Sequence, residues 1–135
     1  MTRYNDRDTD PEKISLCIFS ALYAPSMGGV ETYTESLAHA LTDAGCKVTI
    51  ATMNTHNAKS HERDDDVKII RLPALNVLGG RYPLPKCNAE YRAAMERLIE
   101  SCPNYVVVNT RFYPLSLTGL SFARKLGIAP VLVEH

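Results

Sequence analysis

The chain has 135 residues, of which 45% are hydrophobic and 22% charged, and its formal net charge is zero. This composition predicts one globular domain, gives no electrostatic argument for a nucleic-acid partner, and contains no apolar run near the roughly 20 residues of a membrane-spanning helix. Residues 1–12 are polar and lack the apolar core of a signal peptide. We therefore expect a flexible lead-in over residues 1–12, a domain over residues 13–135 and a cytoplasmic location.

Apolar runs that suit buried strands alternate with helical patterns along the chain. Strands are predicted at residues 13–20, 46–54, 67–73, 104–110 and 129–135. Apolar positions three and four residues apart predict helices over residues 30–44, 88–101 and 114–127, and Gly45 and Gly127 suit the ends of the first and last. This alternation predicts a Rossmann-like, doubly wound parallel sheet of order 3-2-1-4-5, counting strands along the chain. Ligands of such sheets bind at the carboxyl ends of the strands.

Two connections carry no regular pattern. Residues 55–66 are polar and include the charged run HERDDD, so we expect a surface loop rather than the helix that usually joins parallel strands. Residues 74–87 contain two prolines and two glycines, which predicts a long irregular connection after a strand that stops at Pro73.

The four cysteines are scattered, without a Cys-x-x-Cys pair. We expect buried free thiols rather than a disulfide framework or a metal site, and no cofactor.

Gly28 and Gly29 stand directly before the first predicted helix, where Ser, Thr, Asp or Asn is the favoured cap. Without Cβ atoms, these positions let a ligand approach the free N–H groups of a helix, whose dipole favours an anion there. The stretch SMGGVETY matches neither the G-x-G-x-x-G fingerprint nor the P-loop. A purely structural turn is the alternative interpretation.

Three further residues are candidates for contact with an acceptor. Asn109 and Arg111 lie at the end of the fourth predicted strand, where a guanidinium could bind an anionic acceptor group. The alternative is a polar strand end with a solvated arginine. Glu31 is either an acceptor contact or a first-turn acid that the helix dipole favours.

The stretch FSALYAPSMGGVETYTESLAHALTDAGCKVTIAT, with VVVNTRFYPLSLTGLSFARKLGIAPVLVEH downstream, resembles the N-terminal domain of GT-B glycosyltransferases of the family 4 type. In that family a C-terminal domain holds most of the nucleotide-sugar, and the N-terminal domain contacts the acceptor. The resemblance implies a retaining hexosyltransferase of carbohydrate biosynthesis. By the same resemblance, Gly28 and Gly29 face the donor phosphates and His135 is the catalytic residue that contacts the transferred sugar.

The donor domain of that family carries a Glu-x7-Glu motif, and no two glutamates of this chain lie eight residues apart. We therefore expect a truncated acceptor-side domain that binds a nucleotide-sugar and transfers sugar only together with a donor-binding domain. The expected acceptor is a glycan, a lipid or a small molecule. Peripheral contact with the inner face of a membrane, self-association, and a partner chain carrying the donor domain are further expectations.

Two alternatives remain open. The chain could be a non-catalytic remnant or binding module that kept a Rossmann-like fold. A flavodoxin-like or nucleotide-binding regulator is disfavoured, because no acidic cluster suited to phosphoacceptor chemistry follows the first predicted strand.

Overall fold

The computed structural model describes residues 14–20, 29–54, 59–64, 66–75, 84–109 and 114–133. The described strands are β1 (Ser15–Phe19), β2 (Lys47–Asn54), β3 (His61–Asp64), β4 (Val67–Leu75), β5 (Leu84–Pro85), β6 (Tyr105–Asn109) and β7 (Pro130–Val133). The described helices are α2 (Gly29–Asp43), α3 (Ala89–Glu100) and α4 (Pro114–Lys125). No helix in these ranges combines the length and the apolar character needed to cross a bilayer.

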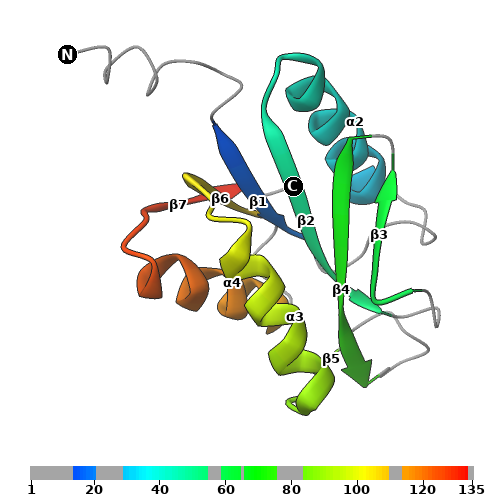
Figure 1. Cartoon of the computed structure of the whole chain (residues 1–135), viewed down its shortest axis with the longest axis vertical. Coiled ribbons are helices and arrows are strands. Elements are labelled where there is room, and N and C mark those ends of the chain that lie inside the picture. Colours follow the sequence, from blue (N-terminus) through cyan, green and yellow to red (C-terminus); the bar gives the residue numbers. More distant parts are fainter. Residues whose placement is uncertain are drawn as a thin grey trace.

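The strands form a sheet in the order β3-β4-β2-β1-β6-β7, and β5 pairs with the end of β4 (Figure 1). The pairs from β4 to β7 along this path are parallel. Within it, β4-β2-β1-β6-β7 is the predicted order 3-2-1-4-5, so the predicted α/β class and the arrangement of its five strands are confirmed. Two additional strands, β3 and β5, were not predicted.

The first addition, β3, corrects the prediction of a surface loop over residues 55–66. This strand pairs antiparallel with β4, with His61 opposite Ile70 and Asp64 opposite Val67. An antiparallel edge strand brings the chain back to the start of β4, so β2 and β4 can be parallel neighbours although no helix is described between them. His61 and Arg63 are exposed, which explains why the composition of this strand is typical of a loop.

The buried side chain of Arg71 ties β3 and the residues before it to β4. Its Nη1 donates to Glu62 Oε1 over 2.9 Å and to the carbonyl oxygen of Lys59 over 3.0 Å. The backbone N–H of Arg71 donates to the carbonyl oxygen of Ser60 over 2.7 Å. Long-range contacts of this kind have no local sequence signal, and they favour a strand where the charge run predicts a loop.

The second addition corrects the prediction for residues 74–87 and the predicted end of a strand at Pro73. Pro73 lies inside β4, opposite Asn54 of β2, and its carbonyl oxygen accepts from the N–H of Lys86 over 3.0 Å. The last two residues of β4 then pair antiparallel with β5. Pro73 lacks a donor, but its acceptor is still used, so the strand continues through it.

The helices cover opposite faces of the sheet: α2 packs on one face, and α3 and α4 pack on the other (Figure 1). The α2 face is a buried cluster of Ile18, Ala38, Val48, Ile50, Val67, Ile69 and Val107. The opposite face is larger and includes the rings of Phe19 and Phe122, whose centroids lie 5.4 Å apart. Strands buried on both faces require the continuous apolar runs from which they were predicted.

Glycine allows α4 to approach the sheet closely at one point. A Cβ atom at Gly119 would lie 2.8 Å from Phe19 Cγ and 3.0 Å from Val108 Cγ2, which is closer than side chains tolerate. Two other glycines end helices as predicted: Gly45 follows α2 with φ of 97°, and Gly127 follows α4 with φ of 71°.

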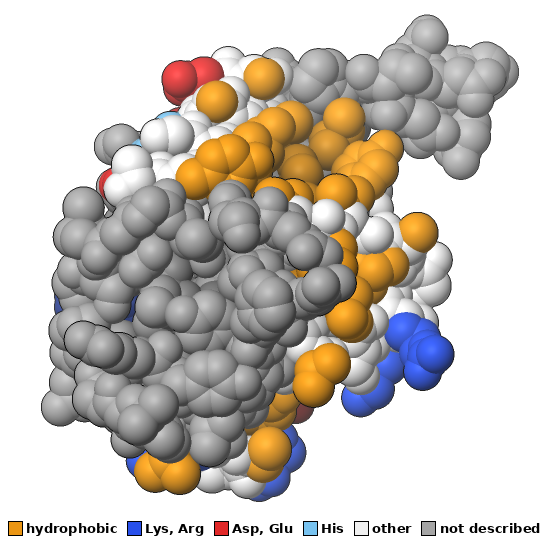
Figure 2. All heavy atoms as spheres, turned by 180° about the vertical axis from the view of Figure 1, so that it is seen from behind, with side chains coloured by type: hydrophobic (Ala, Val, Ile, Leu, Met, Phe, Trp, Pro, Cys, Tyr) orange, Lys and Arg blue, Asp and Glu red, His pale blue; other side chains and the backbone are white. Residues whose placement is uncertain are grey.

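Several large hydrophobic side chains remain on the surface, and part of this apolar surface gathers on the face shown in Figure 2. β7 lies at the end of the sheet, where Val131 is 50% and Leu132 41% exposed. This predicted strand is therefore an edge strand with incomplete cover, unlike the buried β1 and β6.

Candidate functional site

The carboxyl ends of the parallel strands and the amino end of α2 meet at one edge of the sheet. β1 ends at Phe19, and α2 begins at Gly29 and runs back along the sheet to the start of β2. The first-turn N–H groups of α2 therefore lie at the carboxyl edge. They are near the end of β1, which has β2 on one side and β6 on the other. This is the edge at which open α/β sheets bind ligands.

Beneath this helix end, polar side chains form a row across four adjacent strands. Thr52 of β2 is opposite Arg71 of β4. Ser20 follows Phe19, which is opposite Ala51 and Val108, so Ser20 stands level with Thr52 and Asn109. Each stands two positions after an apolar residue of the α2 face, such as Ile18 or Val107, and therefore lies on that same face. We call Ser20, Thr52, Arg71 and Asn109 the polar row; their exposed fractions are 1%, 1%, 4% and 1%.

A side chain of α2 contacts one end of this row. The Nδ2 of Asn109 donates to Thr34 Oγ1 over 2.6 Å, and Thr34 is completely buried. The backbone carbonyl oxygen of Asn109 accepts from Ser116 Oγ of α4 over 3.5 Å. Asn109 therefore links β6 to α2 and to α4.

Two atoms of the polar row have no hydrogen-bond partner although they are buried: Thr52 Oγ1 and Asn109 Oδ1. Most buried polar atoms in proteins are paired, and exceptions concentrate at sites whose arrangement is not optimised for stability. Both exceptions within the described part of the chain fall in one row at the carboxyl edge. The row is therefore a candidate functional feature as well as a structural one.

The sequence-predicted site residues are only partly covered by the structure. Gly29 is the first residue of α2 and Glu31 lies in its first turn. Asn109 is the last residue of β6, with its side chain buried. Gly28, Arg111 and His135 lie outside the described residues, so their roles stay predictions.

Sequence reasoning missed Thr34 and three members of the polar row: Ser20, Thr52 and Arg71. A signal for the row was present, because a polar residue stands two positions after an apolar one near the end of each strand. The pairs are Ile18 and Ser20, Ile50 and Thr52, Ile69 and Arg71, and Val107 and Asn109. The contact of Thr34 with Asn109 had no such signal, because the two residues are 75 positions apart.

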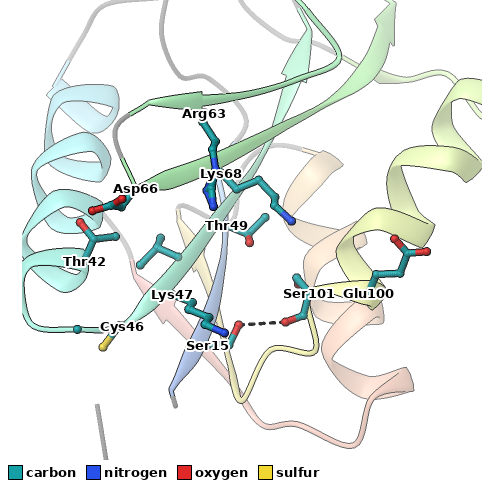
Figure 3. Close-up of a pocket in the computed structure, with 12 residues that line it drawn as sticks. Ser15, Thr42, Cys46, Lys47, Thr49, Arg63, Asp66, Lys68, Glu100 and Ser101 are labelled. Atoms are coloured by element: carbon teal, nitrogen blue, oxygen red, sulfur yellow. Dashed lines mark hydrogen bonds between the residues drawn. The ribbon is translucent and has the colours of Figure 1, made fainter. Parts of the chain in front are cut away.

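A hollow lies at the opposite, amino edge of the sheet (Figure 3). Its volume is about 500 Å³, and its lining includes Lys47, Arg63 and Lys68. The carboxyl ends of α2 and α3 lie here, represented by Thr42 and Ser101 in the lining, and Ser15 Oγ donates to the carbonyl oxygen of Ser101 over 3.1 Å. Helix carboxyl ends carry negative partial charge, which the basic side chains complement. The basic side chains at this edge therefore have an electrostatic role that requires no bound anion.

The cysteines depart from the prediction of buried thiols. All four are free, but only Cys17 is fully buried; Cys46 is half-buried, and Cys87 and Cys102 are exposed. Burial raises the pKa of the Cys17 thiol far above its ordinary value, so this group stays neutral. In the described part of the chain, no three His, Cys, Asp or Glu residues are grouped so that they could hold a metal ion.

Comparison with known proteins agrees with this architecture. The profile of the glycosyl transferase 4-like domain family matches residues 28–135. The uncharacterized glycosyltransferase MJ1069 of Methanocaldococcus jannaschii is 31% identical over 115 residues, which are 83% of this chain and 29% of that protein. An uncharacterized 42.6 kDa protein in the cps region of Klebsiella pneumoniae is 33% identical over 79 residues, 54% of this chain and 21% of that protein.

The chain thus spans less than a third of the length of either relative. The family profile covers most of the chain, and the M. jannaschii protein aligns with a similar share of it. The resemblance found in the sequence is confirmed: the chain belongs to the glycosyl transferase 4-like domain family.

Proposed function

We propose that the chain is the acceptor-side domain of a retaining glycosyltransferase, which transfers a sugar from a nucleotide-sugar to a glycan, lipid or small-molecule acceptor. Membership of the glycosyl transferase 4-like domain family supports the class of reaction. Because the chain spans less than a third of either relative, the donor-binding domain is proposed to lie outside it. The chain alone is then expected to bind nucleotide-sugars weakly and to transfer no sugar.

The observation that carries this proposal is the position of the amino end of α2 at the carboxyl edge of the sheet. The N–H groups of a first helical turn have no partner within the helix, and the dipole places partial positive charge there. Gly29 adds no side chain between these donors and a ligand. A diphosphate is the anion that this helix end would receive from a nucleotide-sugar.

In the proposed reaction, the bond between the anomeric carbon and the diphosphate oxygen breaks, and the acceptor oxygen bonds to that carbon on the same face. The acceptor hydroxyl gives its proton to the leaving phosphate. The amides of Gly28 and Gly29 stabilise the charge that develops on the leaving group. His135 contacts the transferred sugar, and Arg111 and Glu31 are assigned to the acceptor.

The test is a nuclear magnetic resonance titration of the ¹⁵N-labelled chain with UDP, with pyrophosphate and with uridine. If backbone amides bind the diphosphate, UDP and pyrophosphate shift the same amides in the first turn of α2, while uridine leaves them unchanged. The expected affinity is in the millimolar range, because most donor contacts are proposed to lie in another domain. Absence of saturable shifts at this helix end would contradict the proposal.

Two variants locate the site. Gly29→Val should abolish the pyrophosphate shifts while the chain stays folded, because its side chain blocks close approach. A Lys47→Gln, Lys68→Gln variant removes two exposed cations from the amino edge and should leave the shifts unchanged. If the second variant abolishes binding and the first does not, the anion binds at the amino edge instead.

A further inference from the structure

Asn109 and Thr34 join two elements that are far apart in the sequence. Their hydrogen bond, Nδ2 to Oγ1 over 2.6 Å, is buried. Thr34 is five residues after the first residue of α2, which is about 7.5 Å along a helix that rises 1.5 Å per residue. A bond at this point therefore determines where the first-turn N–H groups of α2 lie relative to the end of β6.

The rest of the environment of Asn109 makes it a suitable anchor. β6 lies between β1 and β7, and Asn109 is opposite Val133 of β7. Its carbonyl oxygen is also the acceptor for Ser116 Oγ in the first turn of α4. A residue fixed by two strands and one helix can transmit its position to a second helix through one side-chain contact.

The side-chain amide of Asn109 is only partly hydrogen-bonded. A purely structural link between β6 and α2 would not require an unpartnered atom. One end of its amide reaches Thr34, while Oδ1 is buried and unpartnered. Thr52, in the same polar row, has a second unpartnered atom. A row selected only for stability would pair these atoms or replace them with apolar groups.

We propose that Asn109 and Thr34 are positioning residues that aim the amino end of α2 at the diphosphate of the ligand. This inference rests on the proposed function, because it assumes that the helix end binds an anion. Neither side chain contacts the diphosphate in this account: Asn109 acts through Thr34, and Thr34 acts through the helix backbone. The sequence pointed to Asn109 as an acceptor contact, and its burial favours this indirect role instead.

The matched variants are Thr34→Ser, which keeps the hydroxyl group, and Thr34→Val, which keeps the shape but loses it. In the pyrophosphate titration, Thr34→Val should weaken binding about tenfold, the scale of one hydrogen bond to a positioned group, and Thr34→Ser should stay within about twofold of the wild type. Asn109→Leu should resemble Thr34→Val. Melting temperature and the exchange rates of the α2 amides without ligand are measured on the same samples.

The possible results separate the positioning role of Thr34 from the proposed anion site. Weaker binding and faster exchange in the first turn of α2 in the Thr34→Val variant, restored in Thr34→Ser, supports the positioning role. If the wild type binds pyrophosphate and both Thr34 variants bind it equally well, the positioning role is wrong and the proposed anion site stands. If the wild type shows no binding at α2, the proposed anion site fails and the positioning role fails with it.

Discussion

Arg71 and Glu62 form an ion pair of unequal burial: the arginine side chain is 4% exposed, the glutamate side chain 38%, and Nη1 lies 2.9 Å from Oε1. Removal of the glutamate takes away the hydrogen bond and the negative charge that Glu62 supplies to this buried guanidinium. We predict that Glu62→Ala lowers the free energy of unfolding by about 1–3 kcal/mol, toward the lower end because Glu62 is partly solvated.

The control for this prediction is the double variant Glu62→Ala, Arg71→Met, measured with both single variants by urea denaturation. Removing the buried charge as well should recover part of the loss, so the effects of the two substitutions should not add. Strictly additive effects would show that the pair does not fasten β3 to β4.

The close approach of α4 to the sheet gives a second prediction. Gly119→Ala should lower the free energy of unfolding by about 1–3 kcal/mol, because the new Cβ overlaps Phe19 and Val108. Gly127→Ala should cost about 1 kcal/mol through its positive φ alone, because nothing lies within 4 Å of its added Cβ. Thermal denaturation of both variants, each with and without Phe19→Leu, separates the causes. The smaller leucine side chain should restore stability to Gly119→Ala and not to Gly127→Ala. An equal change in the stability of both variants would contradict the packing argument.

For one residue of the polar row, we predict a substitution that raises the free energy of unfolding. Thr52→Val keeps the side-chain shape and removes a buried, unpartnered hydroxyl group, so it should raise the free energy of unfolding by up to about 1 kcal/mol. Thr34→Val removes a paired hydroxyl group and should lower it. Chemical denaturation of the two variants under identical conditions makes the comparison. A loss of stability in Thr52→Val as large as that in Thr34→Val would mean that the Thr52 hydroxyl is paired in solution.

Burial of Cys17 predicts a dependence of stability on pH. Its folded-state pKa is raised because burial penalises the thiolate, whereas in the unfolded chain a thiol ionises near pH 8.5. The contribution of this neutral thiol to the free energy of unfolding is fully present below that pH. Above it the native state binds more protons, so the free energy of unfolding falls by up to about 1.4 kcal/mol per pH unit. Urea titrations between pH 7 and pH 10 should show a shallower fall for Cys17→Ala. Identical slopes would exclude this contribution.

The sequence was sufficient for the parts of the fold that depend on local pattern. Continuous apolar runs predicted the five parallel strands, and three- and four-residue spacing predicted all three described helices. Gly45 and Gly127 marked helix ends because their positive φ favours glycine. These signals lie within a few residues of the structure that they predict.

Apart from the order of the five parallel strands, the features that depend on distant contacts were not predicted. The charged run at residues 61–64 forms a strand because β4 offers a free edge and Arg71 binds Glu62 and Lys59. Pro73 suggested the end of a strand, but pairing with β5 extends it. At the candidate site, Asn109 was identified from its place after an apolar run, whereas its burial and its contact with Thr34 follow from packing 75 residues apart.

We propose that the amino end of α2, at the carboxyl edge of the sheet, receives the diphosphate of a nucleotide-sugar. Hydrogen exchange followed by mass spectrometry, with and without saturating UDP, tests it most directly. If the diphosphate binds there, exchange slows in the peptide that covers the first turn of α2 and stays unchanged in peptides that cover the amino edge around Lys47 and Lys68. Protection confined to the amino edge, or no protection at α2 under saturating UDP, would contradict it.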